Sequence, residues 1–120
     1  MKQKLLLLWI ASLLLFSSCN EVITCIITSP APTTLDEFVA FYENQSIFVS
    51  VDASTTKNTI RQVQLFVDED VIFSTLTSPY NFTIPPGTIA PGLHILSAVA
   101  HSSGGNREVA AIYINIKEAK

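Results

Sequence analysis

Few side chains in this 120-residue sequence are placed to do chemistry. His94 and His101 are its two histidines. A zinc centre needs three or four ligands, and no cysteine clearly joins this pair, so the histidines do not predict a metal site. His94 falls on the apolar face of its expected strand, which favours a half-buried histidine that hydrogen-bonds a backbone carbonyl. We expect neither a metal nor a cofactor.

The run Asp68, Glu69 and Asp70 is the densest group of acids. Hard cations bind clustered carboxylates, but three adjacent side chains on a tight turn rarely converge on one ion, so we favour a solvated hairpin turn. Acids in turns do not make the carboxylate pair, one with a raised pKa, that glycoside hydrolysis uses. A nucleophile elbow and a phosphate-binding loop are also missing. The sequence therefore predicts no catalytic residues and no enzyme.

Two aromatic residues, Phe48 and Phe66, lie off the alternating apolar faces of their expected strands. An exposed aromatic pair on a sheet face stacks on a sugar ring or on a protein partner. The alternative is that loops or a second sheet bury both rings. If the rings are exposed and their strands adjacent, Phe48 and Phe66 form one candidate binding face.

The N-terminal segment indicates export. Lys2 and Lys4 precede an apolar run from Leu5 to Phe16, and the small residues Ser17 and Ser18 follow. This order predicts a secretory signal peptide over residues 1–18. The run has roughly a dozen residues, fewer than the ~20 that a transmembrane helix needs.

The segment Phe16-Ser17-Ser18-Cys19 resembles the lipobox of bacterial lipoproteins. The resemblance implies cleavage before Cys19, acylation of that cysteine and a membrane tether, which is stable when two or more chains are attached. Asn20 is not the aspartate that often retains this family at the inner membrane, so the resemblance implies a lipid-anchored protein of the cell envelope, at the outer membrane. Two alternatives are an unmodified Cys19 and a Cys19–Cys25 disulfide, which excludes the lipid.

The rest of the chain has the size of one domain, about a hundred residues. Two of the seven basic residues, Lys2 and Lys4, lie in the signal, which leaves five against ten acids. Without a basic patch, nucleic acid is not an expected partner.

Apolar residues alternate in short runs from residue 46 onward. Glycine, proline or Asx residues punctuate these runs every eight to twelve residues, as in a β-sandwich. The best run starts at Gly92, with Leu96 and Ala98 on one face. A weak stretch from Leu35 to Phe41 has helix-like spacing instead. The expected inner layer is Val49, Val51, Val63, Leu65, Leu96 and Ala98.

The order of the segments resembles that of bacterial immunoglobulin-like domains. The matching segments are Ile27-Thr28-Ser29-Pro30, Ile60 to Asp68, Thr77-Ser78-Pro79-Tyr80-Asn81-Phe82, Gly92 to Ala100 and Gly105-Asn106. The resemblance covers about residues 22–116. It implies an all-β immunoglobulin-like sandwich of about seven strands, a domain of about residues 22–117. His101-Ser102-Ser103 stands where many members carry an acid, so calcium binding is not implied.

Three segments are expected: a signal peptide over 1–18, lipid attachment with a short first strand and linker over 19–34, and the remaining sandwich over 35–120. The favoured function is a non-catalytic, membrane-anchored surface or periplasmic interaction module that binds a protein or serves in adhesion. The alternative is a carbohydrate-binding accessory lipoprotein of a polysaccharide-degrading system. The expected ligand is a protein or a glycan.

Overall fold

The computed structural model describes residues 21–31 and 38–119, which form two stacked β-sheets and no helix. No helix that could span a bilayer occurs in these residues. The expected all-β immunoglobulin-like sandwich is confirmed, with eight strands where about seven were expected. The strands are β1 (Ile23–Ser29), β2 (Val39–Tyr42), β3 (Ile47–Thr55), β4 (Ile60–Val67), β5 (Asp70–Thr75), β6 (Tyr80–Ile84), β7 (Gly92–Ser102) and β8 (Arg107–Lys117).

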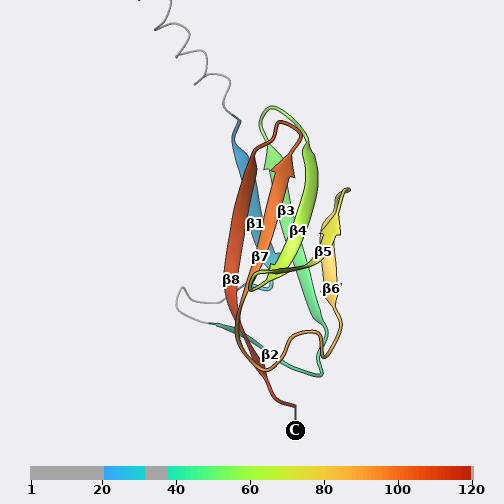
Figure 1. The fold of residues 1–120 in the computed structure, drawn as a ribbon, viewed down its shortest axis with the longest axis vertical. Coiled ribbons are helices and arrows are strands. Elements are labelled where there is room, and N and C mark those ends of the chain that lie inside the picture. The colour runs from blue at the N-terminus through green and yellow to red at the C-terminus, as the bar shows by residue number, and fades with distance from the viewer. Residues whose placement is uncertain (1–20, 32–37, 120) are drawn as a thin grey trace, which may run out of the picture.

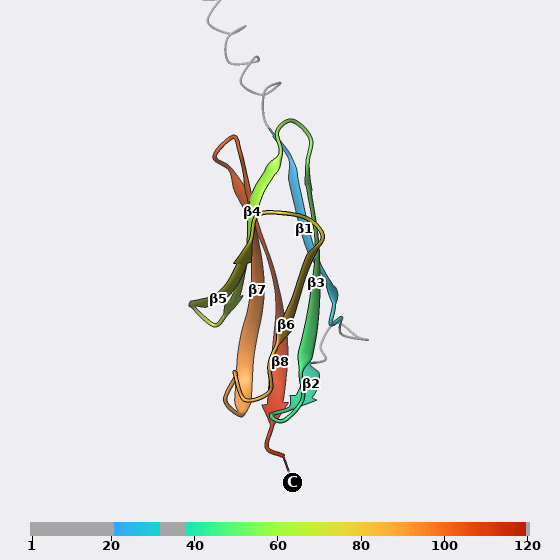
Figure 2. The same ribbon diagram turned by 90° about the vertical axis from the view of Figure 1, so that its right-hand side faces the viewer.

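One sheet has three strands in the order β1-β3-β6, and the other has five in the order β2-β8-β7-β4-β5. Figure 1 shows the strands running along the long axis of the sandwich, and Figure 2 shows the two sheets edge-on, with β4 and β7 opposite β1 and β3. Every pairing is antiparallel except that of β2 with β8.

Alternating side chains build the core between the sheets. All six residues of the expected inner layer are buried, so that prediction is confirmed. Leu96 on β7 is fully buried, as are Val49 on β3 and Val63 on β4. Their neighbours along each strand point outward, because side chains alternate between the faces of a sheet.

Strand β2 departs from the expectation. The helix-like spacing from Leu35 to Phe41 is not followed, since the described part of that stretch enters the sheet as β2. Val39 pairs in register with Ile114 of β8, and both Val39 and Phe41 pack against the core. Backbone pairing with the edge of β8 outweighs the weak local preference.

Candidate functional site

The structure does not bring the two predicted aromatic residues together. Phe48 lies on β3 of the three-stranded sheet, and its side chain is 54% exposed. Phe66 lies on β4 of the five-stranded sheet and is partly buried. Both point away from the core, so they lie on opposite outer faces of the sandwich. A shared platform required adjacent strands, and it does not form because β3 and β4 belong to different sheets.

The outer face of the five-stranded sheet carries an apolar groove instead. The groove has a volume of about 250 Å³ and is lined by Phe38, Leu93, Ile95, Tyr113, Asp68 and His94. Leu93 is 63% exposed and Tyr113 is 58% exposed. The Phe38 and Tyr113 rings stack with centroids 5.3 Å apart and planes inclined by 17°. This is an exposed apolar surface of the kind that marks contact sites on soluble domains.

Cross-strand register explains how distant residues meet in the groove. Ile95 of β7 pairs with Tyr113 of β8, and both project outward, because the neighbouring Leu96 and Ile114 point into the core. The parallel pairing of β2 with β8 brings Phe38, which immediately precedes β2, to the same area. Phe66 pairs with Ser97, two residues from Ile95 on the same face, and so flanks the groove without lining it.

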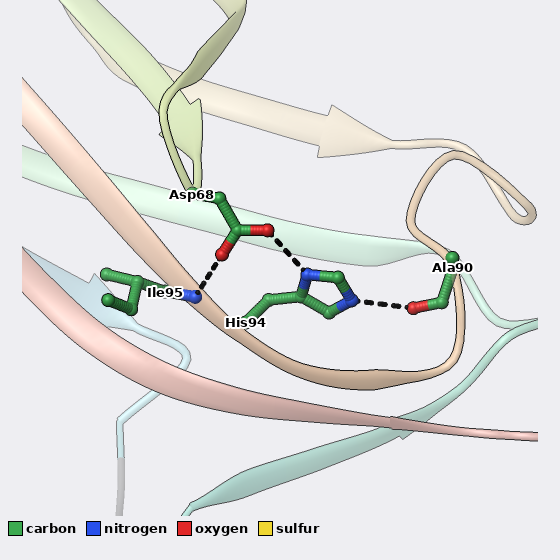
Figure 3. A network of polar contacts seen from close by, with 4 residues as sticks. All are labelled: Asp68, Ala90, His94 and Ile95. Carbon is green, nitrogen blue, oxygen red and sulfur yellow. Dashed lines mark hydrogen bonds and ion pairs between the residues drawn. The ribbon is translucent and has the colours of Figure 1, made fainter.

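A polar contact network forms one rim of the groove (Figure 3). The carboxylate of Asp68, in the turn between β4 and β5, accepts a hydrogen bond from the Ile95 backbone N–H at 3.0 Å. Its other oxygen lies 2.8 Å from Nδ1 of His94, and Nε2 of His94 lies 2.7 Å from the carbonyl oxygen of Ala90. Asp68 has a φ of 56°, a left-handed conformation that Asp tolerates better than most residues.

This network demands a doubly protonated histidine. Both ring nitrogens of His94 face oxygen atoms that only accept hydrogen bonds, so each nitrogen must donate. The hydrogen bond with Asp68 is the main cause that raises the pKa of His94, and burial opposes it. The same bond lowers the pKa of Asp68. The expected contact of His94 with a backbone carbonyl is confirmed, and the contact with Asp68 makes that residue more than a solvated turn position.

The raised pKa of His94 makes stability depend on pH. Its protonated form stabilises the fold fully below the ordinary value of 6.5, and that contribution is lost as pH rises through the raised pKa. We therefore expect His94→Gln to have less effect on the urea unfolding midpoint at about pH 8.5 than at about pH 5.5.

His101 provides a control of opposite sign for this measurement. Burial, followed by the charges of Arg61 and Arg107, lowers the pKa of His101. The neutral form is therefore favoured by folding, and its contribution is lost as pH falls. The urea unfolding midpoint of His101→Gln should accordingly fall less between about pH 8.5 and about pH 5.5 than that of the wild type. Equal effects of His94→Gln at both pH values would contradict the proposed protonation state.

A second, polar hollow lies on the outer face of the three-stranded sheet. Its volume is about 430 Å³, and its lining includes Thr28, Ser50, Asp52, Asn81 and Tyr80. Ser50 donates a hydrogen bond to Asn81 at 2.8 Å, and Thr28 donates one to the Ser50 carbonyl. Phe48, two residues from Ser50, points from the same face of β3. Hydroxyl, amide and carboxylate groups are therefore grouped near one exposed ring.

The first described residue, Glu21, is fixed at one end of the sandwich. Its carboxylate accepts hydrogen bonds from Thr55, from Ser102 at 2.8 Å and from Asn106 at 2.9 Å. These bonds, that of Thr55 first, lower its pKa to about 2. A Cβ at Gly104 would clash with Nδ2 of Asn58 and lie 3.2 Å from Oε1 of Glu21, so a glycine there leaves room for this network. The chain is therefore held to the sandwich two residues after Cys19.

The described residues contain no group of three or more His, Cys, Asp or Glu side chains that could hold a metal ion. His101 lies apart from His94, and its Nε2 atom is 2.7 Å from Oε1 of Gln64. Cys25 is a free cysteine buried in the core, and burial is the main cause that raises the pKa of its thiol. Cys19 and the expected signal peptide lie outside the described residues.

The residues that line the groove were not predicted as a site. One signal was present, since Leu93, Ile95 and Val99 make the outward face of β7 as apolar as its inward face. The meeting of Phe38 with Tyr113 depends on pairing between segments far apart in the sequence, which alternation within one strand does not reveal.

Comparisons with known proteins agree with this architecture. A family model described as the bacterial Ig domain matches residues 24–98. The fibronectin(III)-like modules of Clostridium thermocellum CbhA superpose with a TM-score of 0.67 at 25% identity, covering 78% of this chain and 96% of that one. A search of curated protein sequences found no significant match.

Two more distant structures share the fold alone. Bacteroides ovatus SGBP-B of a mixed-linkage glucan utilization locus, solved with a mixed-linkage heptasaccharide, has a TM-score of 0.57 at 11% identity. The match covers 84% of this chain and 25% of that one. The superoxide reductase (neelaredoxin) from Ignicoccus hospitalis has a TM-score of 0.56 at 16% identity. This match covers 84% of this chain and 85% of the reductase chain. Because the two differ in function, the shared fold does not assign one.

Proposed function

Because the chain belongs to the bacterial Ig domain family, whose sandwich fold is typical of non-catalytic interaction modules, we propose that it is a membrane-tethered module that binds a protein partner. The contact surface is the apolar groove on the outer face of the five-stranded sheet. The tether is a lipid on Cys19, in the cell envelope and at the outer membrane. The observation that carries the proposal is the exposed cluster of Phe38, Leu93, Ile95 and Tyr113.

The position of the groove suits a tethered module. Glu21 is held beside the turns between β3 and β4 and between β7 and β8, at one end of the sandwich. The start of β7 and the end of β8 lie toward the opposite end (Figures 1 and 2). Arg107 and Tyr113 are six residues apart on β8, roughly 20 Å at about 3.3 Å per residue. A lipid on Cys19 would therefore leave the groove displayed away from the bilayer.

The chemistry of the groove favours a protein partner over a sugar. Sugar hydroxyls need hydrogen-bond partners when they leave water, and unmet ones are costly. Four of the six lining residues are apolar or aromatic. Both ring nitrogens of His94 are engaged, so of the charged groups that line the groove only the Asp68 carboxylate, at one rim, has accepting capacity left. Apolar and aromatic side chains of a partner need no hydrogen-bond partners in the groove, and buried aromatic anchors are prominent among the residues that dominate binding energy in protein interfaces.

A second candidate function is carbohydrate binding on the other face. The observation that favours it is the polar hollow beside Phe48, which combines hydroxyl, amide and carboxylate groups with one exposed ring. Sugar binding commonly combines ring stacking with hydrogen bonds to hydroxyl groups. A glycan array probed with the purified chain tests this candidate. Glycan binding that is lost in Phe48→Ala would support it and would displace the groove as the principal site.

Binding through the groove is tested by two variants matched in exposure. Leu93 is 63% exposed in the groove, and Val22 is 62% exposed outside it. We expect Leu93→Asp to weaken binding to a protein recovered from the cell envelope at least about tenfold, because a buried, unpaired carboxylate is costly in an interface. Val22→Asp should leave that affinity unchanged. Equal binding by the two variants, both folded by their unfolding midpoints, would refute the proposed surface.

A further inference from the structure

We infer that the groove takes a protein segment in which an apolar side chain is accompanied by a nearby lysine or arginine, and that this basic residue pairs with the acidic turn of Asp68, Glu69 and Asp70. This inference rests on the proposed function and adds the chemistry of the partner. It is carried by the position of the acidic turn at the edge of an otherwise apolar surface.

The charges around the groove are one-sided. Asp68 lines it, the exposed Glu69 follows in the same turn, and the exposed Asp70 is the first residue of β5. Among the described residues, Asp68 and its two acidic neighbours in the chain thus stand against one imidazolium, that of His94, and none of the side chains that line the groove is a lysine or an arginine. A basic group on the partner complements this rim, whereas an acidic group would be repelled.

The basic residues of this sheet lie away from the acidic turn. Arg107 pairs in register with His101, six residues along β7 from Ile95, or roughly 20 Å. Arg61 lies near the same end, since both arginines act on His101. Lys117 is nearer to the groove, two residues beyond Asn115, the register partner of Leu93. It is nevertheless four residues, roughly 13 Å, beyond Tyr113, and β8 is separated from β4 and the acidic turn by β7. In the described part of this sheet, no arginine or lysine therefore lies beside the acidic turn.

The carboxylate of Asp68 is held ready for such a contact. The Ile95 N–H and the His94 ring fix its two oxygens, and its side chain remains 51% exposed. Each carboxylate oxygen has a second lone pair that can accept another hydrogen bond. A charge-assisted hydrogen bond at the edge of an apolar contact is stronger than one in open solvent, because the contact excludes water from around it. Ile95 links the apolar groove to the acidic rim, because its side chain lines the groove and its backbone N–H orients the Asp68 carboxylate.

A random-peptide display library screened against the full chain tests the inference. We expect the peptides selected by the wild type, and not by Leu93→Asp, to share an aromatic or aliphatic residue near a lysine or arginine. For one synthetic peptide of this kind, replacing the basic residue by glutamate should weaken binding about tenfold, and added salt should weaken it further.

Variants of the rim separate charge from structure. Asp68→Asn should reduce affinity for the basic peptide about three- to fivefold, the range of a partly exposed ion pair. A Glu69→Gln/Asp70→Asn double variant should reduce affinity for the basic peptide by a similar factor. It leaves the contact between Asp68 and His94 in place. Asp52→Asn, on the opposite face, is the control and should have no effect.

The outcomes distinguish the inference from the proposed function. Groove-dependent peptides with neutral or acidic consensus, or unchanged affinity in both rim variants, would overturn the basic partner and leave the groove as a binding surface. Failure to select any groove-dependent peptide would overturn both. A dimer of the wild type that Leu93→Asp dissociates would identify a second copy of the chain as the occupant and would also overturn both.

Discussion

Leu96→Ala is expected to lower the free energy of unfolding by about 2–5 kcal/mol. Leu96 is fully buried on the inner face of β7, the central strand of the five-stranded sheet. Truncation removes apolar contacts with the surrounding core and leaves a cavity that the opposing sheet closes only in part. Urea denaturation followed by fluorescence or circular dichroism gives the value.

Glu69→Ala is the control for this loss. Glu69 is exposed between β4 and β5 and takes no part in the contacts of Asp68. Its removal should change stability by no more than about 0.5 kcal/mol. Similar losses for the two variants would contradict the assignment of Leu96 to the inner layer on which the sandwich depends.

Cys19→Ala is expected to move the protein from the membrane fraction to the soluble fraction. A thioether-linked lipid needs the Cys19 thiol, and in the proposed arrangement the acyl chains are the groups that hold the protein on the bilayer. Metabolic labelling with an alkyne analogue of palmitate, followed by fractionation, measures both attachment and location. The wild type should be labelled and membrane-bound.

Cys25→Ala distinguishes lipid attachment from a general effect of losing a cysteine. Cys25 is buried, and its thiol contacts the Ala98 carbonyl at 3.6 Å. This variant should keep both the label and the membrane fraction, with some loss of stability because a buried side chain is truncated. A wild-type protein that is soluble and unlabelled would refute the tether.

Much of the fold was predictable because alternation in the sequence reflects burial directly. Val63 and Leu65 of β4 alternate with polar residues, and the structure buries both. Strand β2 was not predictable on this basis. Its four residues gain their structure from parallel pairing with β8, more than seventy residues later, and local spacing carries no information about that partner.

The binding surface was less predictable than the core for the same reason. Phe48 and Phe66 were correctly placed off the apolar faces of their strands, but the sequence does not say which sheet receives each strand. The stack of Phe38 on Tyr113 and the contact of Asp68 with His94 both join residues on different strands. Such contacts depend on register between strands, whereas alternation describes one strand at a time.

Site-specific photo-crosslinking in intact cells tests most directly whether the groove is the binding surface. A benzophenone amino acid is introduced at Tyr113 or Leu93 in the groove, and at Phe48 on the opposite face as the control. We expect irradiation to give a discrete adduct with another protein from Tyr113 and Leu93 and none from Phe48, and we expect Ile95→Asp to abolish the adduct. Adducts from Phe48 alone, or none at either groove position, would contradict a protein-binding groove.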